Sequence, residues 1–515
     1  MTDTPDLKTT AGKIADLENR LAASRSPLGD NTPLSEGLTA RQRVEELLDA
    51  GSFVETDALA RHRSTDFDRE HNKPETDGVI TGYGTIDGRK ACVYSIDATI
   101  FDGTLGEVSG EKIVKIYDLA IKTGVPIVSI VESAGARVQE GIVTMAMYAR
   151  ILARAAKASG LIPQVSIIVG DNEGIAGFPP ALADIVIMTT AGALHQAAPL
   201  AVKEVFDQEL TGAELGGAAV HSNNGTAHVV VESDSAALAA ARDVLGYLPI
   251  NNRAETPRSE ADIMSGSVAE NITAADRKLD AIIPDDDAIV FDMSNVVEAI
   301  VDSNSFFELQ PQFAPNMITG FARIEGRAIG VVANQPAALG GALDSRAAEK
   351  AARFIRTCDL FNTPVVTFVD SPGFIPSPEE ETAGLVRRAS ALAFAYAETT
   401  VGTMTVICRK AIGPAFVFMG AKDLGVDFAY AWPTANITVA TELQTADSIY
   451  GSDASPEQVE ELAAKFSGPY QAAERGIVDA VIEPASTRGH LIEGLRLLER
   501  KVVPPIAKKY GNIVL

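Results

Sequence analysis

Several features are scarce in this 515-residue chain, and each scarcity excludes a class of protein. The chain has three cysteines, Cys92, Cys358 and Cys408, which lie far apart and form no Cys-x-x-Cys pair. This spacing disfavours both a disulfide framework and a zinc ribbon, and it is typical of proteins kept in a reducing compartment. The sequence therefore predicts a cytoplasmic protein without structural disulfides.

Positive charge is also in short supply. The 44 lysine and arginine residues face 69 aspartate and glutamate residues, which gives a formal net charge of −25. A surface of this sign repels phosphate backbones, so the composition argues against nucleic-acid binding. An anionic ligand would require a local basic patch.

Long apolar runs and metal-binding patterns are absent as well. No run of about 18 apolar residues offers a membrane span, and the polar stretch 1–20 lacks the apolar core of a signal peptide. His195, His221 and His228 fall within one stretch, but no carboxylate spacing around them indicates metal ligands. We expect these histidines to be structural and the chain to have no metal site.

Two apolar stretches dominate what the chain does contain. Residues 125–135 read VPIVSIVESAG and residues 363–373 read TPVVTFVDSPG, 238 positions apart. Each run is rich in β-branched residues without alternation, which is typical of a strand buried on both faces of a parallel sheet. Each ends in acid-Ser-x-Gly, and a glycine just past a strand permits a sharp turn that aims backbone N–H groups into a cleft.

The same offset links further segments. TGYGTIDGR (81–89) recurs as TGFARIEGR (319–327), and both predict a strand, a tight turn and a returning strand. The matches from 81 to 135 need no gap, so they predict two copies of one βαβ-rich fold rather than generic α/β texture. The polar, Pro- and Ser-bearing stretch 250–295 is the predicted join.

Helices are predicted between these strands. Glu111-Lys112 recurs as Glu349-Lys350, each on a predicted helix before the opening strand. Further helices are predicted at 9–24, 39–48, 139–159, 381–400 and 455–475, and a last one ends near Arg500.

Each half also has a second strand that ends in a glycine-containing turn. The strand 163–170 leads into DNEGIAGFPPALAD (171–184), and the strand 402–410 leads into AIGPAFVFMGAKD (411–423). We expect the two strand-ending turns of each half to lie side by side in a sheet. Their backbone amides then predict an oxyanion pocket.

Seven segments spread along the chain form one specific combination. They are ESAGAR-x-QEG (132–141), ELGGA (214–218), EKAARFIR (349–356), VDSPGFIP (369–376), RRASALAFAYAE (387–398), AWPTA (431–435) and AAERGIVDAVI (472–482). By these segments the chain resembles the β (carboxyltransferase) subunit of biotin-dependent acyl-CoA carboxylases, the acetyl-CoA/propionyl-CoA carboxylase β family, as a divergent paralogue of the actinobacterial type. The resemblance implies an α/β fold of two tandem crotonase/ClpP-like (ββα superhelix) domains. They would span 1–260, on the acyl-CoA side, and 270–515, on the biotin side.

The resemblance also implies an activity and partners. The chain would transfer CO2 from carboxybiotin to the α-carbon of an acyl-CoA, with biotin on a separate biotin carboxylase/biotin carrier α subunit. Paralogous β subunits would stack into a hexamer, a trimer of dimers. The sequence has no Met-Lys-Met biotinylation motif and no GxxxxGK[ST] loop, which agrees with a subunit that receives carboxybiotin.

The family holds its oxyanions with backbone N–H pairs in two Gly-Gly-Ala turns, which here read GIA (174–176) and GPA (413–415). Ile175 keeps its N–H, but its branched side chain forbids most backbones with positive φ. Pro414 has no N–H, and losing one oxyanion donor costs about 10²–10³-fold in rate. By this resemblance the catalytic turn positions are Gly174, Ile175, Pro414 and Ala415.

The resemblance places the substrate-binding residues around the same turns. They are Ala134, Gly135, Arg137, Gly373, Phe374, Val417 and Lys422. Arg137 and Lys422 could attract CoA phosphates, or they could be solvated or ion-paired. Val417 stands where the family lines the acyl pocket, and an apolar residue there is compatible with a longer acyl chain.

Two further stretches depart from the family pattern. ATELQTADSIYG (440–451) replaces a Gly/Ala-rich stretch, and its Glu442 would add negative charge near a site that handles anions. LHQAAPLAVKEV (194–205) stands where the family usually has a Thr-Gly-Pro turn.

Three functions stay open at this stage. The first is an active carboxyltransferase, and the second is a catalytically weak or silent paralogue that supports an active β subunit in a mixed hexamer. The third is another crotonase-like enzyme, such as a hydratase or a decarboxylase. A hydratase would need paired glutamates at the turns, whereas Glu173 has no evident partner.

Overall fold

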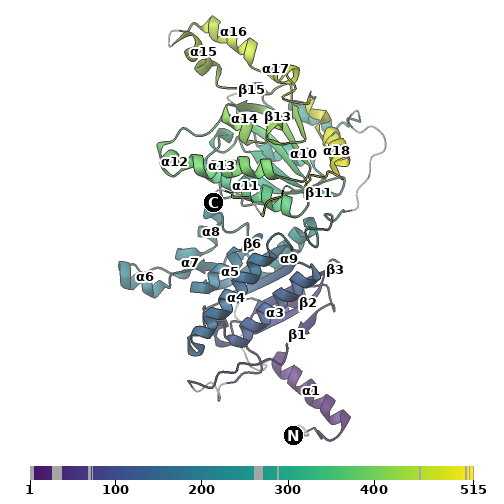
Figure 1. The fold of residues 1–515 in the computed structure, drawn as a ribbon, viewed down its shortest axis with the longest axis vertical. Coiled ribbons are helices and arrows are strands. Elements are labelled where there is room, and N and C mark those ends of the chain that lie inside the picture. The colour runs from purple at the N-terminus through teal and green to yellow at the C-terminus, as the bar shows by residue number, and fades with distance from the viewer. Residues whose placement is uncertain are drawn as a thin grey trace. The chain divides into compact units, whose positions relative to one another are not determined.

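The chain forms two compact units, Met1–Ala254 and Glu255–Leu515, and each is considered by itself (Figure 1). The computed structural model describes residues 5–25, 37–67, 71, 73–259, 269, 271–286, 289–451, 454–504, 507–509 and 511–513. Parts of the predicted join, residues 260–268, 270, 287 and 288, therefore lie outside the described residues.

The first unit is built on an eight-stranded sheet with the order β1-β2-β3-β4-β5-β6-β8 and with β7 beside β5. Strands β1 to β3 pair antiparallel, and the remaining pairs are parallel. The strands are β1 (Val54–Thr56), β2 (Val79–Ile86), β3 (Arg89–Ile96), β4 (Ile127–Ser133), β5 (Gln164–Glu173), β6 (Ile185–Thr189), β7 (Ala193–His195) and β8 (Val229–Val231).

The second unit repeats this topology. Its sheet has the order β9-β10-β11-β12-β13-β14-β16, again with an extra strand, β15, beside the fifth. The strands are β9 (Phe307–Leu309), β10 (Met317–Ile324), β11 (Arg327–Asn334), β12 (Val365–Ser371), β13 (Thr403–Ile412), β14 (Phe428–Ala431), β15 (Asn436–Thr438) and β16 (Ala480–Val481). The predicted α/β class and the predicted duplication are confirmed.

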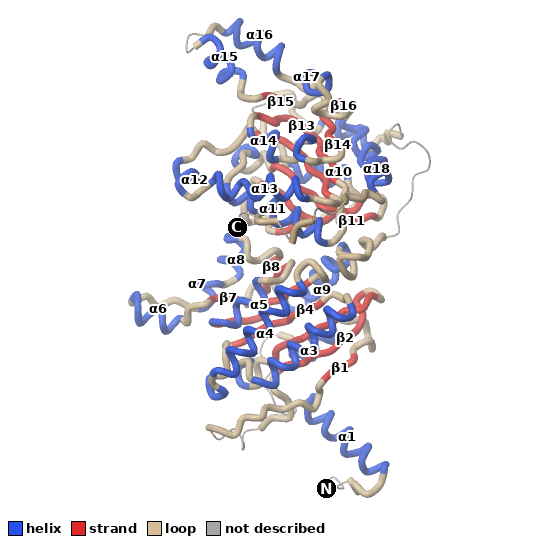
Figure 2. Tube along the Cα trace, viewed as in Figure 1, coloured by secondary structure: helices blue, strands red, loops and turns tan. Residues whose placement is uncertain are grey.

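Several helices pack on each sheet (Figure 2). The first unit has α1 (Thr10–Arg25), α2 (Ala40–Leu47), α3 (Glu107–Thr123), α4 (Ile142–Ala158), α5 (Phe178–Ala181), α6 (Pro199–Phe206), α7 (Gly212–Gly216), α8 (Ala218–Asn224) and α9 (Asp234–Tyr247). The second has α10 (Met293–Ile300), α11 (Ser345–Leu360), α12 (Pro378–Thr382), α13 (Leu385–Glu398), α14 (Pro414–Phe418), α15 (Glu442–Tyr450), α16 (Pro456–Phe466), α17 (Tyr470–Glu474) and α18 (Thr487–Leu498). Helices α1, α15 and α16 instead extend away from the strands of their unit (Figure 2). Within the described ranges, none of the helices combines the length and apolar character needed to cross a membrane.

One predicted helix is wrong as a single element. The stretch 455–475 forms α16 and α17 with a break between them. Pro469 lies in that break, and a proline disfavours helical geometry at the residue before it, here Gly468. The polar pattern alone did not reveal the interruption.

The two Pro-led strands are buried as their composition predicts. Every residue of β12 is buried, and β4 is buried except for Glu132. Each lies between parallel neighbours in its sheet, with helices packed on the sheet. The carboxyl ends of β4 and β12 therefore lie in the buried centre of each sheet.

The repeated Glu-Lys pairs place a lysine inside each unit. The Lys350 ammonium donates hydrogen bonds to the carbonyl oxygens of Gln310, Phe313 and Met317 at 2.8, 2.9 and 2.6 Å. Lys112 donates to the carbonyl of Val79, the position that matches Met317 across the 238-residue offset. Each lysine thus fastens its helix, α3 or α11, to the neighbouring sheet.

We expect the Lys350→Met variant to change how the stability of the second unit depends on pH. Burial lowers the pKa of Lys350 from 10.5 to about 8 in the folded protein. Between these two values the unfolded chain binds more protons than the folded one, so the free energy of unfolding of the wild type rises with pH. The rise relative to the variant is at most about 3 kcal/mol.

The chain's single tryptophan makes this prediction measurable. Trp432 lies buried in the core of the second unit, so its fluorescence during urea unfolding reports that unit. Lys112→Met, which alters the first unit, is the matched control and should leave the Trp432 curve unchanged. Parallel pH dependences of the wild type and Lys350→Met would contradict the expectation.

Candidate active site at the strand-ending turns

The two predicted turns of the first unit lie side by side. Strands β4 and β5 are parallel neighbours, and Ser133 pairs with Asn172 at their carboxyl ends. Gly135 has a φ of +87° and lies so close to the next turn that a Cβ there would stand 3.0 Å from the carbonyl oxygen of Glu173. The turn after β4 and the turn after β5 therefore form one surface.

The second unit repeats the arrangement at β12 and β13. Ser371 pairs with Ala411, and a Cβ at Gly373 would stand 3.8 Å from the carbonyl oxygen of Ile412. The Gly413 amide donates to the carbonyl of Thr438 at 2.8 Å, which ties the second turn to β15. Each unit thus brings its own pair of turns together, as the sequence predicts.

The conflict predicted for Ile175 does not arise, which corrects the sequence interpretation. The positive φ falls on Gly174, at +63°, whereas Ile175 is the second residue of a short 3-10 helix (Gly174–Gly177) and its φ is not positive. Its side chain is partly buried and packs against the core of the first unit. The first N–H groups of a helix have no acceptor within it, so the Ile175 amide is a candidate oxyanion donor.

Pro414 occupies the position in α14 that tolerates proline best. Gly413 takes the positive φ, +57°, and Pro414 is the first helical residue, where an N–H has no partner within the helix. The Phe416 amide donates to the Gly413 carbonyl at 3.2 Å. Among the amides that open the helix, Ala415 therefore keeps a donor and Pro414 has none.

The structure places Arg137 in an internal ion pair. Its side chain is 1% exposed, and Nη1 lies 2.6 Å from Asp77 Oδ1 and 3.0 Å from Glu140 Oε1. The guanidinium carbon also lies over the ring of Phe101, 4.6 Å from its centroid. Of the alternatives open to Arg137, the ion pair is the one observed. A role in binding CoA phosphates stays a prediction.

The other predicted binding residues differ in exposure. Lys422 is one-third exposed and pairs with Asp479. Val417 is 43% exposed on α14, and Phe374 packs edge-to-face on Phe418 with ring centroids 5.2 Å apart. The Ala134 amide donates to the carbonyl of Asp102 at 3.0 Å, which fixes the turn after β4.

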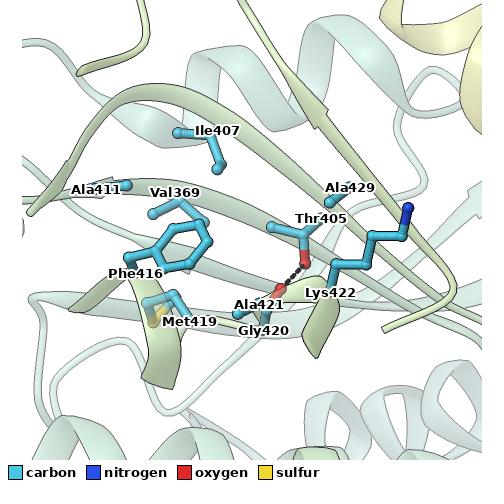
Figure 3. Close-up of a pocket in the computed structure, with 10 residues that line it drawn as sticks. All are labelled: Val369, Thr405, Ile407, Ala411, Phe416, Met419, Gly420, Ala421, Lys422 and Ala429. Carbon is cyan, nitrogen blue, oxygen red and sulfur yellow. Dashed lines mark hydrogen bonds between the residues drawn. The ribbon is translucent and has the colours of Figure 1, made fainter. Parts of the chain in front are cut away.

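A small apolar cavity lies beneath the second turn (Figure 3). Val369 of β12, Phe416 and Met419 line it, and Lys422 stands at one end. The Thr405 hydroxyl donates to the carbonyl of Gly420 at 2.7 Å across it. The side chains leave no room for a water molecule in this cavity.

Glu442, predicted as a source of negative charge, is held by hydrogen bonds. Its Oε1 accepts from Asn436 Nδ2 at 3.0 Å and from Ser467 Oγ at 2.8 Å. Burial opposes ionisation, but a backbone hydrogen bond, these two side-chain hydrogen bonds and the charge of Lys410 together outweigh it and lower the pKa of Glu442. The carboxylate thus anchors the start of α15 to β15 and to the segment after α16.

The histidines of the first unit have structural partners. His195 Nε2 lies 2.6 Å from Asp171 Oδ1, and its Nδ1 lies 2.9 Å from the carbonyl of Ala197. His221 contacts the carbonyl of Leu194 at 2.7 Å. In the described part of the chain, no cluster of three or more His, Cys, Asp or Glu residues could hold a metal ion.

Sequence reasoning missed a buried ion pair that supports the second pair of turns. Arg409 Nη2 lies 2.8 Å from Asp370 Oδ2, both side chains are buried, and the Lys410 amide donates to Asp370 Oδ1 at 2.9 Å. The pair ties β12 to β13 just before their turns. The sequence signal that could have revealed this ion pair was Asp370, the acidic residue of the second acid-Ser-x-Gly motif. Glu132, the acidic residue of the first motif, lies 3.5 Å from Arg43.

The comparisons with known proteins cover nearly the whole chain. Residues 35–513 match the family described as the carboxyl transferase domain. The biotin-dependent acetyl-/propionyl-coenzyme A carboxylase beta5 subunit of Mycobacterium tuberculosis is 46% identical over 531 aligned residues, which cover 99% of this chain and 97% of that protein. The methylmalonyl-CoA decarboxylase subunit alpha of Veillonella parvula is 40% identical and covers 99% of this chain and all of its own length.

A solved structure shares the complete fold. The crystal structure of transcarboxylase 12S, described as a hexamer assembly with substrate bound to a multienzyme core, matches with a TM-score of 0.94 and 37% identity. The match covers 98% of this chain and 99% of that one, so the two tandem crotonase-like domains are confirmed. Fold, paired turns and relatives agree, and the chain therefore belongs to the carboxyl transferase domain family, among the β subunits of biotin-dependent acyl-CoA carboxylases.

Proposed function

We propose that this chain transfers a carboxyl group from biotin, carried on a separate α subunit, to the α-carbon of an acyl-CoA. The observation that carries the proposal is the pair of helix-opening turns, one in each unit. At each turn a glycine with positive φ is followed by backbone amides that no helical bond consumes. Such amides are rigid and already oriented, which suits them to hold oxyanions.

The proposal assigns one oxyanion to each unit. Carboxybiotin supplies the CO2 and, through its ureido nitrogen, the base for the α-proton. The chain's own amides then hold the charges, with Ile175 facing the thioester enolate and Ala415 facing the ureido oxygen. The first unit, proposed as the domain 1–260, is the acyl-CoA side, and the second, proposed as 270–515, is the biotin side. Gly135, Gly373 and their neighbours position the bound groups.

We further propose that the chain assembles with β-type chains into a hexamer, a trimer of dimers. Large apolar residues that follow the turns in sequence are exposed in both units. They are Val138, Ile142, Phe178 and Leu200 in the first unit and Val386, Val439 and Leu443 in the second. Where exposed apolar residues form a contiguous patch, they mark a surface that a partner covers. The three cysteines are free and buried, which fits the proposed cytoplasmic location.

The proposed activity has a direct test. The chain is mixed with carboxylated biotin carrier and with acetyl-, propionyl- and long-chain acyl-CoA in turn, and the malonyl-type product is measured. Carboxylation of at least one acyl-CoA is the expected result. Because one relative is a decarboxylase subunit, the reverse loss of carboxyl from methylmalonyl-CoA is followed in parallel. No turnover with any acyl-CoA would contradict the proposal.

One observation favours a second candidate function, a weakly active partner of an active β subunit in a mixed hexamer. Pro414 removes an N–H from the first residue of α14, in the second turn. Co-expression with a paralogous β subunit, followed by purification through a tag on this chain, tests the idea. A chain recovered only as a homohexamer, and fully active by itself, would exclude this role.

A further inference from the structure

A cavity lies beneath the first turn, in the core of the first unit. Val131 of β4, Asn172 of β5, Tyr148 of α4 and Ala176 of the turn are among its lining residues. Its lining atoms leave room for the centre of one water molecule. The lining is mostly apolar, so the few polar atoms that reach the cavity decide what can occupy it.

The orientation of the Asn172 amide is fixed by three carbonyl groups. Its Nδ2 donates to the carbonyl of Gly170 at 2.9 Å and lies 3.4 Å from the carbonyls of Val131 and Ala193. A flipped amide would point its oxygen at three other oxygens, so the NH2 group must face them. The Asn172 oxygen is therefore the atom left over.

That oxygen, Asn172 Oδ1, is an acceptor without a donor. Asn172 is fully buried, and Oδ1 has no hydrogen-bond partner among the described residues. Leaving a buried acceptor unpaired costs free energy, and native proteins usually meet that need with protein donors or with ordered water. A site that is polar at one point and has room for one molecule meets the conditions for buried water.

The second unit provides an internal comparison. Its cavity beneath the second turn has Val369 at the position of Val131 and Ala411 at the position of Asn172 (Figure 3). Ala411 has no polar side-chain atom, and that cavity has no room for water. The cavity beneath the first turn thus has an unpaired side-chain acceptor and room for a water molecule, whereas the cavity beneath the second turn has neither.

We propose that one ordered water molecule occupies the cavity of the first unit and donates a hydrogen bond to Asn172 Oδ1. Tyr148 lines the same cavity, and its hydroxyl donates to the carbonyl of Gly135 at 3.1 Å. A hydroxyl oxygen also has two lone pairs, one of which can accept the second hydrogen of the water. The water then links Asn172, which precedes the turn at 174, to Tyr148, whose hydroxyl bonds the turn at 135. It acts as a positioning element for both turns.

A crystal structure of the full chain at a resolution that shows ordered water tests the proposal. We expect a density peak about 2.7–3.0 Å from Asn172 Oδ1 and none in the cavity beneath the second turn. A second crystal under xenon pressure shows whether the cavity is dry, because dry apolar cavities take up xenon. Absence of the peak, or xenon in its place, would overturn the proposal.

A solution measurement counts the same water by another route. Magnetic relaxation dispersion of 17O-labelled water reports long-lived internal waters, and Asn172→Leu should hold one fewer than the wild type. Ala411→Leu, which fills the matched position in the second unit, should hold the same number as the wild type. An equal count in Asn172→Leu and the wild type would contradict the proposal. If Asn172→Leu does not fold, the crystal alone decides. Neither readout depends on carboxyltransferase activity.

Discussion

Replacing Pro414 with glycine is expected to raise the rate of acyl-CoA carboxylation by about 10²–10³-fold, because it returns an N–H to the first position of α14. An oxyanion donor acts on charge that develops in the transition state. The gain should therefore appear in kcat, with little change in the KM for acyl-CoA. Steady-state kinetics with carboxylated carrier and the best acyl-CoA substrate measure both constants.

Two variants accompany this experiment. Pro456 holds the same first-helical position in α16 and does not belong to either turn, so Pro456→Gly should leave the rate unchanged. Ile175→Gly should change the rate little, because Ile175 already offers an amide from an ordinary backbone conformation. A Pro414→Gly rate equal to that of the wild type would show that the Ala415 amide suffices at the second turn.

The Arg137→Met variant should lower the free energy of unfolding of the first unit by about 3–5 kcal/mol, since it leaves a buried carboxylate without its counter-charge. Asp77, the partner at 2.6 Å, has a fully buried side chain. Hydrogen exchange followed by mass spectrometry, read at peptides from β3 and β4, gives the stability of this unit. Fluorescence of Trp432, which lies in the other unit, should report an unchanged unfolding curve.

The matched control for Arg137 is an arginine in an exposed pair. Arg277 lies 2.7 Å from Glu483, and both side chains are more than half exposed, so Arg277→Met should leave the free energy of unfolding nearly unchanged. Unchanged protection in Arg137→Met, together with a raised KM for acyl-CoA, would contradict the structural role. That outcome would support the predicted contact with CoA phosphates.

Much of the fold was predictable because the chain contains two copies of one sequence pattern, which can be compared with each other. The gapless recurrence of 81–135 at an offset of 238 marks two copies of one topology, and the β-branched runs at 125–135 and 363–373 mark the buried central strands. The family resemblance then located the two turns at 174 and 413. These features depend on residue type and on spacing along the chain, and both can be read directly from a sequence.

The backbone of the two turns was predicted only in part. The chain fixes where the glycines stand, but the structure decides that Gly174 and Gly413 take the positive φ. The residue after each glycine, Ile175 or Pro414, lies in the first turn of a short helix, a conformation that both isoleucine and proline accept. Their side chains thus proved compatible with the turns, and the absent N–H of Pro414 is the remaining chemical difference.

The sequence by itself determined the duplication, the class of fold and the absence of an N–H at Pro414, because each follows from residue type and spacing. Only the tertiary structure decided that Arg137 faces Asp77, that Lys350 meets three carbonyl groups, and that Asn172 keeps an unpaired oxygen. A side chain's electrostatic role depends on burial and on neighbours distant in sequence. Those neighbours are known only once the strands and helices have packed.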